Sequence, residues 1–407
     1  MRRLALTGAA LAALACSGCA IGLTGPAPLI AHDGAVVVAT VVSDTGGDVQ
    51  VWAEYGLTRA YGSQTPRRTI AAEPNTLTGT ELTISGLQRS TLYHYRVCAQ
   101  DSEQQGGPGC GEDRTFRTQR FGCGETVTAD MRLTGDLNCE GFGTALAIGA
   151  PGIEVDLAGH VVFGAGGVAV QNSAGHDDLV VRDGGLSSLG SGIMLEDASG
   201  SRLLDVNVGS TTAISITGGE GNEVRRANLA GLLGLIANGS HGLVVADTEV
   251  NNATSVAIRV FGDNARLVRN RTPTFGGPSA SFVSGIQVAG NGNLVRRNLV
   301  EGPWTEAGIA LLSGSDNSIV ENEVSGGLAD GIFVGAFTAA TTLRDNFAHG
   351  NGDDGIEVAA PATRLRRNRV DDNGDLGIEA VAGVIDLGGN RASGNGNPLQ
   401  CVNVLCQ

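Results

Sequence analysis

A short pattern of the form Gly-Ile-x-Val, or a close variant of it, returns nine times between Gly167 and Ala380. From Gly285 onward its copies begin 23, 23, 24 and 22 residues apart, and a second apolar segment ending in asparagine follows each of them. Each unit has room only for two or three strands of a few residues, and no helical stretch lies between them. Such a unit cannot bury its apolar face alone, so it must stack on its neighbours. The pattern therefore predicts a parallel solenoid of about ten coils.

Stacking of this kind brings equivalent residues of successive coils into columns, because neighbouring coils lie about 4.8 Å apart. An asparagine amide both donates and accepts hydrogen bonds, so a column of asparagines at a turn can bond to itself along the axis. We expect one such ladder at Asn298, Asn322, Asn346, Asn368 and Asn390, and a second at Asn351, Asn373 and Asn395.

Composition limits the classes of protein that fit. The 407 residues are 42% hydrophobic and 17% charged, which suits a chain with a large core and two domains. Aromatic residues make up only 4%, and the 63 glycines follow no triplet, so a collagen or coiled coil is excluded. A net charge of −15 repels phosphate backbones, which excludes nucleic acid as a partner and favours neutral or basic ligands.

The first residues predict export. Arg2 and Arg3 precede an apolar run that is too short to span a bilayer. The run closes in Ala15-Cys16-Ser17-Gly18-Cys19-Ala20, which resembles a bacterial lipobox. We expect residues 1–19 to be the signal, Cys19 to be the lipidated residue with Cys16 as the alternative, and the lipid to be the chain's only membrane contact. Ordinary cleavage would instead release a secreted protein. The expected location is the periplasm or the cell surface, with the lipid as the anchor.

Six further cysteines, an even number, suit an oxidising compartment. Their closest sequence neighbours predict three short-loop disulfides: Cys98–Cys110, Cys123–Cys139 and Cys401–Cys406. A metal site is the rival interpretation, but the six histidines are scattered along the chain.

Residues 29–119, after a flexible tether at 20–28, are predicted to form a domain of short strands with alternating apolar positions. The segment from Gly86 to Tyr93 resembles the tyrosine corner of fibronectin type III domains, in which a leucine packs under a turn that the tyrosine hydroxyl holds. That resemblance implies a β-sandwich that acts as a spacer or adhesion module. Trp52 is expected in its core, with an exposed sugar-binding platform as the alternative.

Residues 120–407 resemble the right-handed parallel β-helix of pectin-lyase-like proteins, in particular the NosD-like periplasmic repeat family. The expected fold is therefore all-β: a fibronectin type III-like sandwich followed by a right-handed parallel β-helix. The resemblance implies lyases, hydrolases, epimerases or adhesins, and does not choose among them. The NosD link also implies copper handling, which three methionines and no paired histidines do not support.

Carboxylates gather on the last coils, at the positions before each glycine and after each isoleucine. Glu357 and Glu379 should stand on adjacent coils about 4.8 Å apart, near the separation of a retaining carboxylate pair, and Asp330 and Asp375 two coils apart near that of an inverting pair. The catalytic candidates are Asp330, Asp354, Glu357 and Glu379. Calcium at Asp353, Asp354 and Glu357 is an alternative, and a solvated acidic face is another.

A ligand-binding groove is the other hypothesis for these coils. Its candidate residues combine aromatic rings for sugar stacking with carboxylates for hydroxyl groups: Trp304, Glu306, Phe333, Asp353 and Asp375. Trp304 covering an edge is the alternative for that residue. A loop insertion at Thr272–Ser284 should bulge from the rod near them.

The arginines of the last coils should lie on a different face, with Asp345 and Arg367 paired between coils. The motifs of polygalacturonase-like hydrolases are missing, since no lysine is present and His349-Gly350 precedes Asp353-Asp354 within one turn. We therefore predict a lipid-anchored, monomeric envelope protein that binds polysaccharide or another surface component. The alternative is a polysaccharide hydrolase, lyase or epimerase that uses the acidic residues.

Overall fold

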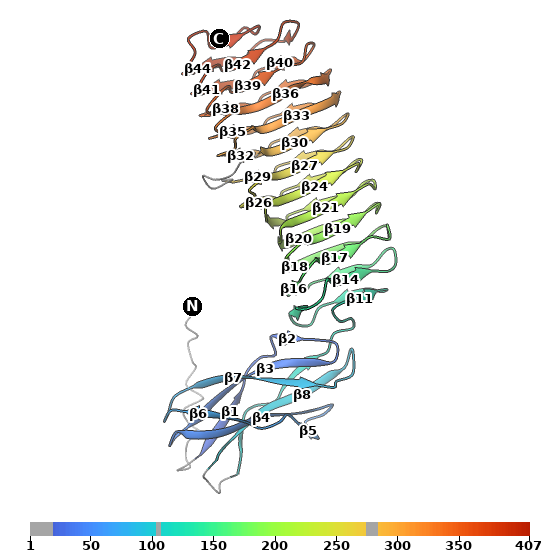
Figure 1. Ribbon diagram of the computed structural model, residues 1–407, viewed down its shortest axis with the longest axis vertical. Coiled ribbons are helices and arrows are strands. Elements are labelled where there is room, and N and C mark those ends of the chain that lie inside the picture. The colour runs from blue at the N-terminus through green and yellow to red at the C-terminus, as the bar shows by residue number, and fades with distance from the viewer. Residues whose placement is uncertain (1–18, 103–106, 274–283) are drawn as a thin grey trace. The chain divides into compact units, whose positions relative to one another are not determined.

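The computed structural model describes residues 19–102, 107–273 and 284–407, and every regular element in them is a β-strand. These residues form two compact units (Figure 1). One unit takes in the chain to residue 122 together with 133–137, and the other takes in 123–132 and 138–407. The main boundary between the units falls at residues 122 and 123, whereas the sequence predicts one between residues 119 and 120. The predicted signal, Cys16 and most of the predicted insertion lie outside the described residues.

The first unit is a sandwich-like domain of ten short strands. Strand β3 pairs with β1, β2 and β7, strand β4 pairs with β5, β6 and β8, and β8 also pairs with β9 and β10. The strands are β1 (Ala20–Thr24), β2 (Leu29–Ile30), β3 (Gly34–Ser43), β4 (Gly47–Gly56), β5 (Ser63–Gln64), β6 (Arg68–Ala72), β7 (Thr78–Ser85), β8 (Leu92–Asp101), β9 (Gly109–Cys110) and β10 (Arg114–Arg117).

Alternation along these strands builds the core, since every second side chain faces inward. In β8, Tyr93, Tyr95 and Val97 are buried, as the pattern predicts. The Tyr93 hydroxyl accepts a hydrogen bond from the backbone N–H of Gln88 at 3.0 Å, above the buried Leu87. The contacts of the predicted tyrosine corner are therefore present.

The predicted tether at 20–28 is wrong for its first five residues. They form β1, which pairs antiparallel with β3 from Ala20–Ser43 to Thr24–Ala39. The apolar side chains of this segment are few, but backbone hydrogen bonds to a long neighbouring strand are enough to order it. Trp52 belongs to the core, with 1% of its surface exposed, and the Arg67 guanidinium lies 4.0 Å from its ring centre. It is not a sugar platform.

The second unit is a right-handed parallel β-helix. A 13-stranded sheet runs along one side, and its strands are paired in parallel, each with the strand one coil away. These strands are β11 (Glu125–Val127), β14 (Thr144–Ile148), β17 (Val168–Asn172), β19 (Ser191–Glu196), β21 (Thr212–Thr217), β24 (Leu233–Asn238), β27 (Val256–Phe261), β30 (Ser284–Ala289), β33 (Ala307–Ser315), β36 (Asp330–Ala339), β39 (Ile356–Val358), β42 (Ile378–Ala380) and β45 (Cys401–Val402).

A 22-stranded sheet forms the other sides of the coils. Its strands are β12 (Met131–Arg132), β13 (Leu137–Asn138), β15 (Glu154–Asp156), β16 (Val161–Ala165), β18 (Val180–Ser188), β20 (Arg202–Gly209), β22 (Glu223–Arg225), β23 (Asn228–Ala230), β25 (Val244–Ala246), β26 (Glu249–Asn251), β28 (Arg266–Val268), β29 (Arg271–Thr272), β31 (Leu294–Arg296), β32 (Leu299–Glu301), β34 (Ser318–Val320), β35 (Glu323–Ser325), β37 (Thr342–Arg344), β38 (Phe347–His349), β40 (Arg364–Arg366), β41 (Arg369–Asp371), β43 (Ile385–Asp386) and β44 (Arg391–Ser393).

The 13 strands of the first sheet correspond to about 12 turns, more than the ten predicted. Nine of the 13 strands carry the repeated pattern, and the other four escape it: β11, β14, β24 and β45. Within the repeats, the isoleucine and valine of each unit point inward; Ile332 and Val334 in β36 are fully buried.

Both asparagine ladders are confirmed. Asn346 accepts hydrogen bonds from the backbone N–H and the side-chain amide of Asn322, and it donates to the amide oxygen of Asn368 at 3.0 Å. The same links join the other members of the column, which extends upstream to Asn270. The second ladder runs from Asn351 through Asn373 and Asn395 to the side chain of Gln400. The ladders satisfy the polar groups of the turns inside the coil, where water has no access.

All three predicted disulfides are present: Cys98–Cys110, Cys123–Cys139 and Cys401–Cys406. Among the described residues no helix has the length and hydropathy needed to cross a membrane.

Candidate functional site

The acidic strip lies on the outer side of the last coils of the 13-stranded sheet. We use this name for Asp330, Asp353, Asp354, Glu357, Asp375 and Glu379. The outward position of the repeat forms a continuous column here, because the parallel register places Phe333 beside Glu357 and Glu357 beside Glu379. Upstream the same column holds Gln287 and Ala310. The predicted neighbourhood of Glu357 and Glu379 is confirmed.

Two pairs of carboxyl groups cross between successive coils of this strip. Asp330, at the start of β36, hydrogen bonds with Glu357 of the next coil, and Asp354 bonds with Glu379 of the coil after that. A hydrogen bond between two carboxyl groups needs a proton on one of them. The raised pKa of the aspartate makes it the proton donor of each pair.

The backbone fixes both aspartates. The Asp354 N–H donates to Oδ1 of Asp330 at 3.2 Å, and the Leu376 N–H donates to Oδ1 of Asp354 at 2.7 Å. Asp354 is 3% exposed, Asp330 and Glu357 are half-buried, and Glu379 is exposed.

Burial sets the acidity of the two aspartates. Loss of solvent raises the pKa of Asp330 from 3.8 to about 8, and the hydrogen bond with Glu357 adds to the rise. Burial likewise raises the pKa of Asp354 to about 7; its bond from the Leu376 N–H opposes the rise, and that with Glu379 supports it. A carboxyl group that keeps its proton at neutral pH is the form that a general acid needs.

The pairing differs from the one predicted between Asp330 and Asp375. Asp375 is exposed and accepts a hydrogen bond from the side chain of Asn397 at 2.9 Å. Aspartates at the strand starts reach along the axis to glutamates at the centre of the next strand. Counting whole coils, as the sequence allows, misses this diagonal contact.

Three acids of the strip offer oxygens for a cation. Asp330, Asp353 and Asp354 can bring one carboxylate oxygen each within 4.8 Å of the others. The predicted calcium trio had Glu357 in place of Asp330. Calcium takes six to eight oxygen ligands, so the trio supplies part of a coordination shell.

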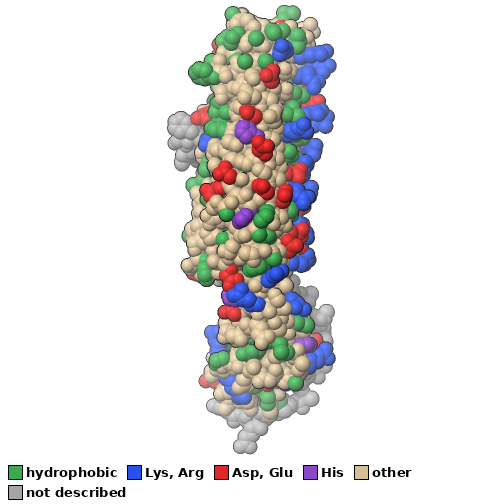
Figure 2. All heavy atoms as spheres, turned by 90° about the vertical axis from the view of Figure 1, so that its right-hand side faces the viewer, with side chains coloured by type: hydrophobic (Ala, Val, Ile, Leu, Met, Phe, Trp, Pro, Cys, Tyr) green, Lys and Arg blue, Asp and Glu red, His purple; other side chains and the backbone are tan. Residues whose placement is uncertain are grey.

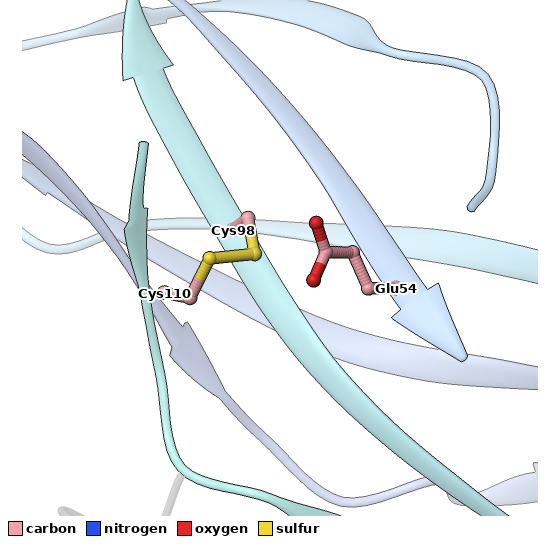
Figure 3. Close-up of side chains that lie close together, drawn as sticks. All are labelled: Glu54, Cys98 and Cys110. Atoms are coloured by element: carbon pink, nitrogen blue, oxygen red, sulfur yellow. A yellow bond between two sulfur atoms is a disulfide. The ribbon is translucent and has the colours of Figure 1, made fainter. Parts of the chain in front are cut away.

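Another group with metal-binding side chains, Glu54 with Cys98 and Cys110, lies in the first unit (Figure 3). It is not a metal site, because both sulfur atoms form a disulfide and Glu54 pairs with Arg96 at 2.7 Å.

Trp304 does not stack on a ligand. Its side chain is fully buried, and its Nε1–H donates to the backbone oxygen of Asp330 at 3.0 Å. The indole lies over Gly327, and a Cβ at that position would overlap the ring. The second asparagine ladder ends at the same residue, because the Gly327 N–H donates to the side chain of Asn351, the first asparagine of that ladder. The expectation of a sugar-stacking Trp304 is therefore wrong. The residue caps the ladder and holds the start of β36.

Phe333 and Glu306 lie where a ligand can reach them. Phe333 is half-buried on the outer face beside Glu357, as predicted. Glu306 accepts hydrogen bonds from Ser284 Oγ at 2.8 Å and from Gln287 Nε2 at 3.1 Å. The sequence reasoning missed Gln287, although its place in the same column as Phe333 identifies it.

The arginines of the last coils lie on the 22-stranded sheet, away from the acidic strip, as predicted. Arg367 makes two hydrogen bonds to Asp345, at 2.7 and 3.0 Å.

Comparison with known proteins supports the fold. A family model described as "Right handed beta helix region" matches residues 279–403. Among solved structures, a double mutant of the periplasmic alginate epimerase AlgG has a TM-score of 0.50 at 12% identity, covering 68% of this chain and 85% of that one. A single mutant of AlgG gives the same score and identity, with 68% and 82% covered. The A-module of an Azotobacter vinelandii mannuronan C-5 epimerase scores 0.38 at 10% identity, with 70% and 91% covered.

No curated protein matches the sequence. The second unit is thus a right-handed parallel β-helix, and the likeness to these epimerases is one of fold.

Proposed function

We propose that this chain is an exported β-helix protein that binds a polysaccharide along the outer face of its last coils. The observation that carries the proposal is the column in which Phe333 lies directly beside Glu357, whose carboxylate is hydrogen bonded to Asp330. An aromatic ring next to carboxyl groups suits a sugar, which has apolar C–H faces and a rim of hydroxyl groups. The alginate epimerase AlgG, whose fold is similar to this one, acts on a polysaccharide as its name says, and this agrees with the proposal.

The charge of the strip narrows the ligand. Asp353 and Asp375 are exposed acidic side chains, and Glu357 and Glu379 stand beside each other on the outer face. No arginine of the described residues forms an ion pair with any member of the strip. A polyuronate would be repelled here, so the expected ligand is a neutral glycan or one with amino groups.

Export through a lipobox signal, the lipid on Cys19 and the fibronectin type III-like spacer belong to the same proposal. The three disulfides support an oxidising compartment. Cys19 directly precedes β1 and its sulfur atom is disulfide-bonded in the structure, so a lipid on this residue requires that bond to be open.

The binding proposal is tested by affinity electrophoresis in gels that contain β-1,4-glucan, chitosan or polygalacturonate. We expect retardation by a neutral or amino polymer, and loss of most of it in Phe333→Ala. Phe261→Ala, which removes an outward aromatic ring from the earlier strand β27, is the matched control. Equal retention of both variants, or retention by polygalacturonate that Phe333→Ala lowers, contradicts the proposal.

Catalysis on the same glycan is the second candidate, favoured by the proton that Asp330 and Asp354 hold near neutral pH. In this reading one aspartate acts as general acid and Glu357 or Glu379 as the ionised partner. Incubating the protein with the same polymers should then release reducing ends or unsaturated products. Asp330→Asn and Asp354→Asn should abolish the product while binding persists. If product forms in both variants, the strip is not catalytic.

A further inference from the structure

One coil near the C-terminus carries four arginines in six residues, Arg364-Leu-Arg-Arg-Asn-Arg369. The coil turns a corner between β40 and β41 at Arg367, whose φ of 51° is in the left-handed region. Leu365 is buried, whereas Arg364 and Arg366 are exposed on the outer face. Because strands of successive coils are in register, Arg344 stands beside Arg366, and Arg391 beside Arg369. We call these six arginines the arginine corner.

Positive charge is in excess at this corner. Asp345 is shared by Arg344 at 2.8 Å and Arg367 at 2.7 Å, and Asp371 pairs with Arg369. The guanidinium groups of the other three members have no hydrogen bond or ion pair with the described residues; they are Arg364, Arg366 and Arg391. Figure 2 shows arginine side chains gathered along one edge of the solenoid. In a chain with a net charge of −15 such a concentration is unusual, and three arginines without an ion pair, around an Asp345 that already pairs with two others, point to an anionic ligand.

The chemistry of the side chains narrows that ligand. All 27 basic residues of the chain are arginines, and the planar guanidinium group binds a carboxylate or phosphate through two parallel hydrogen bonds. Neighbours across coils are about 4.8 Å apart and alternate residues on a strand about 7 Å apart, so the cations form a two-dimensional array. An array of this kind matches repeated charges on a linear polymer better than one small anion.

Flat rings lie beside the cations. The guanidinium group of Arg369 lies over the ring of Phe347, 4.6 Å from its centre, and the ring of His349 stacks on the same Phe347 ring with 4.2 Å between ring centres. Phe347 is half-buried and stands in register with Arg369. These rings offer an apolar contact for the C–H face of a sugar next to the groups that would bind its charge.

We propose that the arginine corner binds an anionic polysaccharide through carboxylate or phosphate groups. This surface lies on the 22-stranded sheet and the acidic strip on the 13-stranded sheet, so it is a second binding face whose existence does not depend on the proposed function. A protein with both faces would connect an anionic envelope polymer to a neutral or amino glycan.

The test measures dissociation constants of the full chain at low salt for three polymers: polygalacturonate as the carboxylate probe, phosphomannan as the phosphate probe, and duplex DNA. We expect one of the two glycans to bind, and Arg364→Gln/Arg366→Gln to weaken its binding at least about tenfold, since each lost contact with a charged group accounts for about that factor or more. Higher salt should weaken binding of the wild-type chain. The glycan that binds identifies the anionic group.

The control removes two exposed arginines from earlier coils of the same sheet, Arg202→Gln/Arg266→Gln. Arg202 and Arg266 occupy the strand position of Arg364, and their side chains also have no partner among the described residues. Unchanged affinity in this control together with the loss at the corner supports the proposal. Equal loss in the two variants, no binding of either glycan, or tighter binding of DNA than of both overturns it. A melting curve for each variant shows that it is folded.

Discussion

The shared proton of Asp330 and Glu357 makes the stability of the last coils depend on pH. In the folded chain the pKa of Asp330 is raised to about 8, whereas the unfolded chain has the ordinary value of 3.8. At pH values between 3.8 and about 8 the folded chain holds a proton that the unfolded chain has released, so the free energy of unfolding falls as the pH rises. The contribution of the pair is complete below about pH 4 and is lost by about pH 8. Asp354, with a pKa of about 7, adds to the same trend.

Asp330→Asn removes this dependence at one pair. The amide donates a hydrogen bond to Glu357 without titrating. A pKa raised from 3.8 to about 8 corresponds to an upper limit of about 6 kcal/mol, which we reduce to about 2–3 kcal/mol because the side chain is only half-buried and solvent screens the interaction. We therefore expect the variant to be more stable than the wild type by about 2–3 kcal/mol at pH 9, and nearly equal at pH 5.

Tryptophan fluorescence during urea unfolding measures this change. Trp304 donates to the backbone of Asp330 and reports on the relevant coils, while Trp52 reports on the first unit. A Trp52→Phe background therefore isolates the signal. Asp353→Asn is the control, because it removes an exposed carboxylate from the same strip. If Asp330→Asn and Asp353→Asn follow the pH dependence of the parent chain alike, Asp330 and Glu357 do not share a proton, and the general-acid reading of Asp330 fails as well.

Three further predictions concern the frame of the solenoid. Asn346→Ala should lower the free energy of unfolding in urea by about 3–4 kcal/mol, because the buried Asn346 side chain makes four hydrogen bonds. The control is Asn251→Ala, which removes one member of an exposed amide pair and should lower it by less than about 1 kcal/mol. Similar losses in the two variants would refute the ladder's role. Gly327→Ala should displace the Trp304 indole and shift its fluorescence emission to longer wavelength. Gly79→Ala is the control, because a Cβ there meets nothing within 4 Å. An unchanged emission spectrum in Gly327→Ala contradicts the capping role of Trp304. Asp345→Asn should change the free energy of unfolding by less than about 1 kcal/mol, although Asp345 accepts two hydrogen bonds from Arg367, because both side chains are solvated. A decrease of more than about 2 kcal/mol would show that the arginine corner stabilises the coil.

The repeats were sufficient to predict the solenoid because its geometry is local and periodic. A residue such as Asn322 has its partners one coil before and one coil after it, so spacing in the sequence translates directly into contact. The disulfides followed from proximity for the same reason. Where the pattern weakens, the sequence underestimates the number of turns; the strands missed are β11, β14, β24 and β45.

Positions that interrupt the repeat are harder to predict. Trp304 stands near a turn, and its spacing does not say whether the ring points inward; the glycine that makes room for it, Gly327, lies on the next coil. The Ala20–Thr24 strand depends on backbone hydrogen bonds to β3, which side-chain pattern does not report. The sequence predicts the acidic strip because its residues recur at the same positions of the repeat. It does not predict which carboxyl groups form hydrogen bonds with each other, since that depends on how far each side chain extends along the solenoid axis.

The two asparagine ladders make one complete turn the smallest segment by which the solenoid can be lengthened or shortened. Asn346 passes the same set of bonds to Asn368, 22 residues later, that Asn368 passes to Asn390, so any complete turn offers identical ends to what precedes and follows it. Duplication or excision of whole turns between such points leaves every buried amide partnered, while a change of a few residues leaves one orphaned. The length of the solenoid can therefore change during evolution in steps of about 4.8 Å while the hydrogen bonds of its interior stay the same.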